Sequence, residues 1–446
     1  MQAQLEPNEM GEIIRKVRKQ KGYRLEDLAD GNVSPATISN IERGVPPINQ
    51  TEALYLLDKL GIPTEQIPHL LLDEQQQLVK LERTLLVLES KLEVGKAREV
   101  LHRLESLKID DSHRLAPLLY YLRGKSWIGV NRLDQAERCF NMAIRLSAQQ
   151  GSTSNLESAS FGELGLLYYR KNDLEAAIQY TDSGIDAFDS QGKRQHVWYI
   201  LHMNKGLFLE RMNRIGPCIQ LVEEVWEFKE RIADSYVLSV FYWLRSEMYY
   251  RTGMYEEAID TASEGLDLAR RGKLYRLICA LSTVIGSSLI RIQQLDSAEE
   301  FFQLALTCKG KMEDDRSLTN VYIRLALLYK KQHKPLKATQ CLTEAIRIAE
   351  TCQDVPRLVR SWILMGSLLQ QHNREAAIGY FEKAADTAQE YGLAKQAHEA
   401  TVKLAQCWYK QNEQQFQKYI KRMYEIQAAE IDREEKDWVE EMGRKE

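Results

Sequence analysis

The 446-residue sequence lacks several features that would place it in other classes of protein. No run of about 18 apolar residues occurs, so we expect no transmembrane helix. The seven cysteines are scattered without a CxxC pair, which argues against a zinc site or disulfide framework and favours a cytoplasmic protein. The N-terminus has no apolar signal-peptide segment. The net charge of −4 means that any DNA binding must depend on local charge.

Sequence patterns of common enzymes are also missing. There is no P-loop, no GxGxxG and no recognisable Ser/His/Asp set, and the eight histidines are dispersed. Metal-ligand spacings are absent as well. We therefore expect no enzymatic activity, no metal and no cofactor.

The strongest positive signal is a repeat. Mostly small residues recur every 39 to 41 residues, and a second small residue, usually alanine, follows in most units. Such a period predicts stacked helical hairpins, whose curvature forms a groove suited to extended partners. The first set comprises Leu85, Gly124, Gly165, Gly206, Ser246, Gly286, Ala326, Gly366 and Ala405.

The first 70 residues follow a different pattern. Helices are predicted over 8–21, 34–43 and 50–60, with a short helix around Leu25 and Leu28. Ser34 is a good N-cap, and Pro35 fits the first helical position. Gly22 and Gly44 end the first and third helices, and Pro46 and Pro47 prevent continuation. Short helices with a tight turn before the third predict a helix-turn-helix domain.

The third predicted helix is the candidate reader of DNA bases. Ile38 and Ile41 should face the core. The outward positions are then Pro35, Ala36, Ser39, Asn40 and Arg43. Asn40 can pair with adenine and the Ala36 methyl can meet thymine, while basic residues of the first helix would contact phosphates. The candidate DNA contacts are Arg15, Arg18, Lys19, Arg24, Ser34, Pro35, Ala36, Thr37, Ser39, Asn40 and Arg43.

Residues 11–44, GEIIRKVRKQKGYRLEDLADGNVSPATISNIERG, resemble the XRE (Cro/CI-type) helix-turn-helix family. The family stretch S-x-x-x-I-S-x-I-E-x-G corresponds to Ser34, Ile38, Ser39, Ile41, Glu42 and Gly44. Leu25 stands where the family usually has glutamine, and the turn before Ser34 is one residue short, as in peptide-regulated members. The resemblance implies a lambda-repressor-like fold that binds DNA. The alternative is a four-helix bundle that has kept the fold for protein contacts.

From about residue 74 to 430 the chain resembles tetratricopeptide (TPR) repeats. One unit shows the small–aromatic–small pattern clearly, with Gly124, Trp127, Ala136, Phe140 and Ala143. The period is longer than usual, and the first and last units are degenerate, as capping repeats are. We therefore expect an all-α chain with a helix-turn-helix domain (1–72), a right-handed superhelical TPR solenoid of about nine hairpins (73–430) and a charged tail (431–446).

The inner wall of this solenoid is the candidate peptide site. An asparagine such as Asn204 can grip a peptide backbone, and Arg324 and Arg360 can hold a carboxylate. Tyr169, Met203 and Trp243 can form apolar pockets. The full set is Glu163, Tyr169, Met203, Asn204, Trp243, Glu247, Tyr250, Thr283, Asn320, Arg324 and Arg360. Taken singly, each of these residues can equally be a surface or inter-repeat contact.

An XRE-type domain joined to a long TPR array resembles the RRNPP family of quorum-sensing regulators, above all its NprR branch. The resemblance implies a transcription regulator that binds an operator and a short signalling peptide. It also implies a homodimer, or a higher oligomer with peptide, whose head spacing responds to the peptide. Asn204 lies two residues before a repeat glycine, where the branch holds the peptide backbone. Two alternatives stay open, namely a Rap-like protein that modulates a response regulator's phosphorylation, and a passive TPR scaffold.

Overall fold

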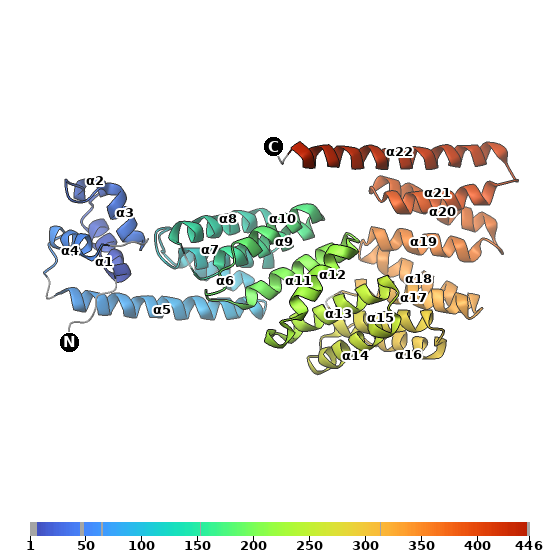
Figure 1. The fold of residues 1–446 in the computed structure, drawn as a ribbon, viewed down its shortest axis with the longest axis horizontal. Coiled ribbons are helices and arrows are strands. Elements are labelled where there is room, and N and C mark those ends of the chain that lie inside the picture. Colours follow the sequence, from blue (N-terminus) through green and yellow to red (C-terminus); the bar gives the residue numbers. More distant parts are fainter. Residues whose placement is uncertain (1–6, 45–48, 64–65, 152, 313, 444–446) are drawn as a thin grey trace. The chain divides into compact units, whose positions relative to one another are not determined.

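The computed structural model describes residues 7–44, 49–63, 66–151, 153–312 and 314–443, and within these ranges the chain is helical without strands (Figure 1). The chain divides into two compact units, Met1–Val225 and Trp226–Glu446. The predicted all-α class is therefore confirmed. None of the described helices combines the length and hydropathy that a membrane-spanning segment needs.

The first unit begins with four helices that share one core. They are α1 (Pro7–Gln20), α2 (Leu25–Leu28), α3 (Pro35–Arg43) and α4 (Gln50–Lys59), within one residue of the predicted ends. Met10, Ile14, Ile38, Leu56 and Leu57 are fully buried together. Pro46 and Pro47 lie outside the described residues.

Two contacts hold α1 against α3. The two helices approach so closely at Gly11 that a Cβ there would lie 2.0 Å from the carbonyl oxygen of Ile41. Arg18 donates from Nε and Nη2 to the two carboxylate oxygens of Glu42, at 2.6 and 2.8 Å. Since both side chains are nearly buried, this ion pair is a structural element of the domain.

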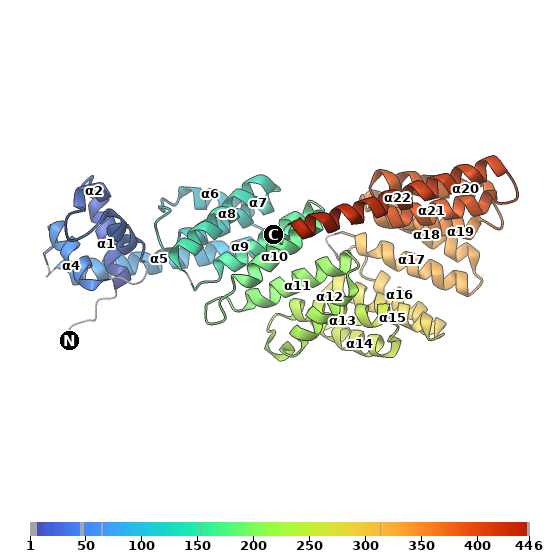
Figure 2. The same ribbon diagram turned by 45° about the horizontal axis from the view of Figure 1, so that its top comes forward.

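The remaining helices of the first unit are stacked in sequence order (Figure 2). Helix α5 packs against α1 and leads from the first four helices into the array. Residue 72, the predicted end of the first domain, lies inside α5. The helices are α5 (Ile67–Glu93), α6 (Ala97–Ser106), α7 (Ala116–Gly129), α8 (Leu133–Gln150), α9 (Leu156–Arg170), α10 (Leu174–Asp186), α11 (His196–Arg211) and α12 (Ile215–Trp226).

The second unit contains the later repeat helices, up to residue 443. Its helices pack pairwise in sequence order, from α13 with α14 to α21 with α22. Helix α22 includes most of the predicted tail. The helices are α13 (Ser235–Thr252), α14 (Tyr255–Arg271), α15 (Tyr275–Arg291), α16 (Leu295–Leu306), α17 (Arg316–Lys331), α18 (Pro335–Thr351), α19 (Val355–Leu369), α20 (Arg374–Glu390), α21 (Ala394–Trp408) and α22 (Glu413–Gly443), with a short 3-10 turn at Lys229–Arg231.

The recurring glycines have a common packing role. A Cβ on Gly124 would lie 2.5 Å from the ring of Phe140, and one on Gly286 would lie 2.9 Å from the ring of Phe302. Both phenylalanines are fully buried. The first helix of a hairpin thus supplies the gap that the aromatic ring of the second helix fills, which explains the period of the sequence.

Candidate functional site

Helix α3 presents one polar face and one buried face, as a recognition helix requires. Ser34 caps the helix by accepting from the backbone N–H of Thr37 at 3.1 Å. Ile38 and Ile41 are buried, while Pro35 and Ala36 are exposed. The face that the sequence assigned to DNA is therefore accessible in the first unit, and Ser34, Asn40 and the half-buried Thr37, Ser39 and Arg43 complete it.

Asn40 and Arg43 act together on this face. Arg43 donates from Nη2 to the side-chain oxygen of Asn40 at 2.8 Å and from Nε to the Ser39 carbonyl at 3.2 Å. This contact occupies the amide oxygen, so the two N–H groups of Asn40 are the donors that remain for a further partner. An asparagine held by arginine in this way presents donors for an acceptor on a base edge.

The turn before α3 is built by Asp30. One carboxylate oxygen of Asp30 accepts from the backbone N–H groups of Asn32 and Val33, at 2.9 and 3.2 Å. The other accepts from Lys59 at 2.5 Å and Tyr55 at 2.6 Å on α4. These hydrogen bonds, above all that from Lys59, hold the pKa of Asp30 well below its usual range. The turn was predicted from the sequence, but the hydrogen bonds that connect Asp30 to α4 were not.

The basic residues of α1 are largely engaged within the first unit. Arg15 is buried and donates to Ser112 at 2.8 Å, and Lys19 pairs with Asp110 at 2.6 Å. Both partners lie in the segment between α6 and α7. Arg18 is held by Glu42, which raises the pKa of the guanidinium. Arg24, by contrast, is exposed, and its backbone N–H donates to Asp27 at 2.7 Å.

In the array of the first unit, Glu163 belongs to a charged cluster. Tyr121 donates to Glu163 at 3.5 Å, and Lys125 lies over the Tyr121 ring, 5.8 Å from its centroid. Burial raises the pKa of Glu163, an effect that Lys125 opposes. Burial lowers the pKa of Lys125, but Glu163 and Glu93 more than compensate and raise it.

Arg194 extends this cluster. It donates from Nη1 and Nη2 to Glu89 of α5, at 2.8 and 3.1 Å, and its guanidinium lies 5.9 Å from the centroid of the Tyr121 ring. Arg194 has a left-handed backbone conformation with a φ of 55°, which is uncommon for a residue other than glycine. Lys125, Arg194 and Glu89 were not identified from the sequence. They do not belong to the repeat pattern, and their pairing depends on how the helices pack in the tertiary structure.

The other predicted residues of the first unit lie on α9 and α11. Tyr169 accepts from Arg211 at 2.8 Å and stacks on Phe208 with ring centroids 5.0 Å apart. Met203 is buried, and Asn204 is 1% exposed. Among the residues that the structure describes, the side-chain nitrogen of Asn204 has no hydrogen-bond partner, which leaves two buried donors unsatisfied. A ligand that uses Asn204 must therefore reach it through a local opening of the packing.

In the second unit, the structure brings Tyr250 of α13 and Arg324 of α17 together. Arg324 donates to the Tyr250 hydroxyl at 2.6 Å and lies 5.0 Å from the centroid of its ring. Arg360 is bound to Glu399 at 2.7 Å, so its charge already has a carboxylate partner. The remaining predicted positions are buried or half-buried: Trp243, Glu247 (paired with Arg251 at 2.8 Å), Thr283 (donating to the Cys279 carbonyl at 2.6 Å) and Asn320.

Two family models match parts of the chain. Residues 14–67 match the helix-turn-helix model HTH_3, and residues 290–438 match the model of soluble NSF attachment protein. No curated protein matches the chain significantly by sequence. The first match covers the segment from α1 to the start of α5 and so includes the α3 face described above.

Several solved structures share the fold of most of the chain. The apo form of the quorum sensor NprR from B. thuringiensis is 17% identical with a TM-score of 0.55, covering 76% of this chain and 96% of that one. The apo form of RapI is 14% identical with a TM-score of 0.55, over 78% of this chain and 97% of that one. A Rap protein complexed with Competence and Sporulation Factor is 12% identical with a TM-score of 0.56, over 80% and 97%. The chain thus joins an XRE-type helix-turn-helix domain to a TPR-like array and has the fold of the NprR and Rap proteins of the RRNPP family.

Proposed function

We propose that this chain is a cytoplasmic, non-enzymatic transcription regulator that binds operator DNA through α3 and a short signalling peptide through its TPR-like array. The observation that carries the DNA part is the face of α3. Pro35, Ala36 and Asn40 are exposed on a capped helix whose opposite face is buried, within the segment that matches the helix-turn-helix family. Such a helix can lie in a major groove and contact base edges.

The peptide part is supported by the shared fold and by polar side chains on the array. One Rap protein of the same fold was solved in complex with Competence and Sporulation Factor. In this chain, the buried donors of Asn204 have no partner within the described part of the structure, and Tyr250 with Arg324 offers a hydroxyl and a guanidinium together. A peptide backbone supplies the carbonyl acceptors that such donors need.

In this proposal, peptide binding regulates DNA binding because both depend on the same arrangement of the dimer. We propose a homodimer whose two heads bind operator half-sites, so that their separation must match the turns of the duplex. A peptide that prefers one arrangement of the array shifts the population of the dimer towards it.

The DNA part is tested by gel shift with the region upstream of the chain's own gene. Asn40→Ala should weaken binding to the preferred sequence by about 1–3 kcal/mol and relax selection of one base pair. Gln50→Ala, at the exposed start of α4, is the matched control and should bind normally. Equal, sequence-specific shifts by all three proteins would refute the assignment of Asn40.

The peptide part is tested by calorimetry. The probes are synthetic C-terminal fragments of short secreted precursors encoded next to the gene. Asn204→Ala should weaken the binding of an active fragment by about 1–3 kcal/mol, because the buried hydrogen bonds from the Asn204 side chain to the backbone of the bound peptide are lost. An unchanged affinity would remove Asn204 from the site, and no binding by any fragment would refute the peptide proposal.

A further inference from the structure

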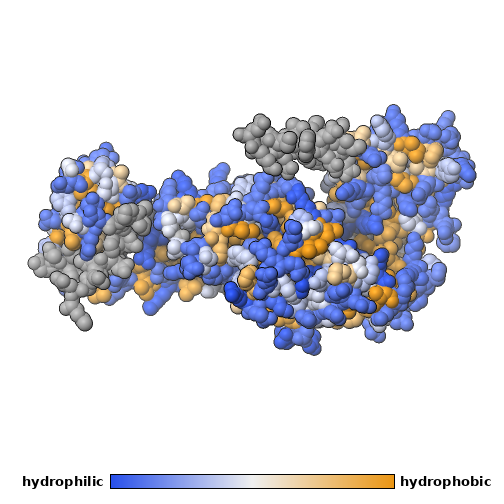
Figure 3. Space-filling view, in the orientation of Figure 1, coloured by the Kyte–Doolittle hydropathy of each residue, from blue (hydrophilic) through white to orange (hydrophobic). Residues whose placement is uncertain are grey.

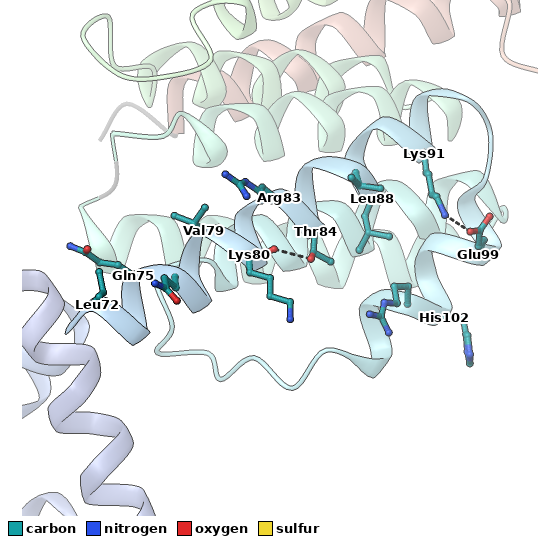
Figure 4. A pocket seen from close by; sticks show the side chains of 13 residues that line it. Leu72, Gln75, Val79, Lys80, Arg83, Thr84, Leu88, Lys91, Glu99 and His102 are labelled. Carbon is teal, nitrogen blue, oxygen red and sulfur yellow. Dashed lines mark hydrogen bonds and ion pairs between the residues drawn. The ribbon is translucent and has the colours of Figure 1, made fainter. Parts of the chain in front are cut away.

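A groove between α5 and α6 of the first unit lies apart from the surfaces described above. Its volume is about 1010 Å³. Figure 4 shows side chains of α5 along one wall and side chains of α6 at the other end. Its principal lining residues are Leu72, Val79, Arg83, Val87 and Leu88 of α5, and His102 of α6.

The α5 wall exposes an unusual amount of apolar side chain. Leu72 is 52% exposed, Val79 41% and Val87 55%. These residues are spaced by seven and eight positions, so they follow one side of the helix. Apolar surface is visible along the part of the first unit that contains α5 (Figure 3). A contiguous apolar stripe beside a groove marks an interaction surface.

The rim of the groove is basic. Lys80, Arg83 and Arg103 line it, and none of them has an acidic partner among the described residues. Lys91 is bound to Glu99 across the two helices. Because like charges oppose association, two such grooves would not pair with each other, and an acidic amphipathic helix is the complementary occupant.

The chain contains one segment of this chemistry at the end of α22. In the sequence of residues 428–443, acidic residues outnumber basic ones seven to two. Ile431, Trp438 and Met442 are spaced by seven and four positions and so share one helical face. The helix continues to Gly443, so this segment is about 24 Å long, against about 30 Å for the stretch of α5 from Leu72 to Lys91.

We propose that residues 428–443 of one copy of this chain dock in the α5/α6 groove of a second copy. The apolar face of the segment covers Leu72, Val79 and Val87, and its carboxylates lie against Lys80 and Arg83. In a two-fold dimer each copy gives one helix and receives one, so both grooves are filled. The inference rests on the homodimer of the proposed function and supplies its interface.

The first test measures the mass of the full-length chain by light scattering, without DNA or signalling peptide. The wild-type chain should be a dimer. Lys80→Glu/Arg83→Glu should weaken dimerisation by about tenfold or more, because the rim then repels the acidic segment. The matched control is Lys96→Glu/Arg98→Glu, at two exposed positions, the residue before α6 and one in its first turn. It changes the same charge outside the groove and should leave the dimer intact. A monomeric wild type, or an intact dimer in the groove variant, overturns the proposal.

The second test exchanges the charges. Glu434→Lys/Glu441→Lys in the segment should also weaken self-association. Mixing this variant with the groove variant should restore a one-to-one heterodimer, since both contacts in it again join opposite charges. Docking of the segment on its own chain would leave the mixture monomeric and would overturn the assignment to a second copy. Because neither test uses DNA or signalling peptide, a negative result here is distinct from a failure of the proposed regulatory function.

Discussion

Replacing Arg18 by alanine separates two roles that this residue can have. The sequence assigned Arg18 to a DNA phosphate, whereas in the structure it binds both carboxylate oxygens of Glu42 and the carbonyl of Tyr23. The exposed fractions of the Arg18 and Glu42 side chains are 11% and 5%. Truncation leaves the Glu42 carboxylate buried without its partner, a change that costs about 3–5 kcal/mol. Since small domains are stable by only about 5–15 kcal/mol, Arg18→Ala should remove a large part of the stability of the first four helices.

The assay is hydrogen exchange measured by mass spectrometry on fragments of α1, α3 and α4. Their slowest amides should exchange about a hundredfold faster or more in Arg18→Ala, while α13 to α22 should be unaffected. The double variant Arg18→Met/Glu42→Leu removes both charges and should recover most of the protection, because apolar replacements of a buried pair are often neutral.

DNA binding by the double variant then decides between the two roles. If Arg18 acts through the fold, the double variant binds the operator nearly as well as the wild type. The reasoning is refuted if Arg18→Ala exchanges normally yet loses DNA binding, since Arg18 would then contact the phosphate directly.

Two further predictions concern the first unit. Gly11→Ala should destabilise the first four helices by about 1–3 kcal/mol or more, because its Cβ meets the Ile41 carbonyl; hydrogen exchange measures this, and Gly31→Ala, whose Cβ meets nothing within 4 Å, is the control that should remain normal. Burial, together with Arg15 and Arg114, lowers the pKa of His113 to about 4. The neutral imidazole therefore stabilises the folded segment above the unfolded pKa of about 6.5, and this contribution is lost as the pH falls towards 4. Protection factors for 107–115 should fall between pH 7 and pH 5 in the wild type but much less in His113→Asn; equal falls in both would contradict the assignment to His113.

Local signals in the sequence were sufficient to predict the helices of the N-terminal domain and their ends. Ser34, Pro35 and Gly44 set the ends of α3 through capping and backbone conformation, which depend on neighbours in the chain. The 40-residue period was equally informative, because each Gly–Phe contact joins two helices of a single hairpin.

The hydrogen-bond and ion-pair partners of charged and polar side chains could not be predicted from local sequence. Arg18 and Arg15 look alike in the sequence, yet one is held by Glu42 and the other contacts Ser112. Asn204 was predicted to be open to a ligand and is instead buried. Each outcome depends on which surfaces the tertiary stack brings together, and the repeat pattern says little about that.

The ion pair between Arg194 and Glu89 is a direct link between two distant parts of the first unit. It joins residues 105 positions apart, and so connects the segment just before α11 directly to α5. Helix α5 leads straight from the four helices that contain the α3 face, while α11 carries Asn204. A displacement at the start of α11 is therefore transmitted to α5 through this one ion pair. It does not have to pass through the hairpins that lie between the two helices in the sequence.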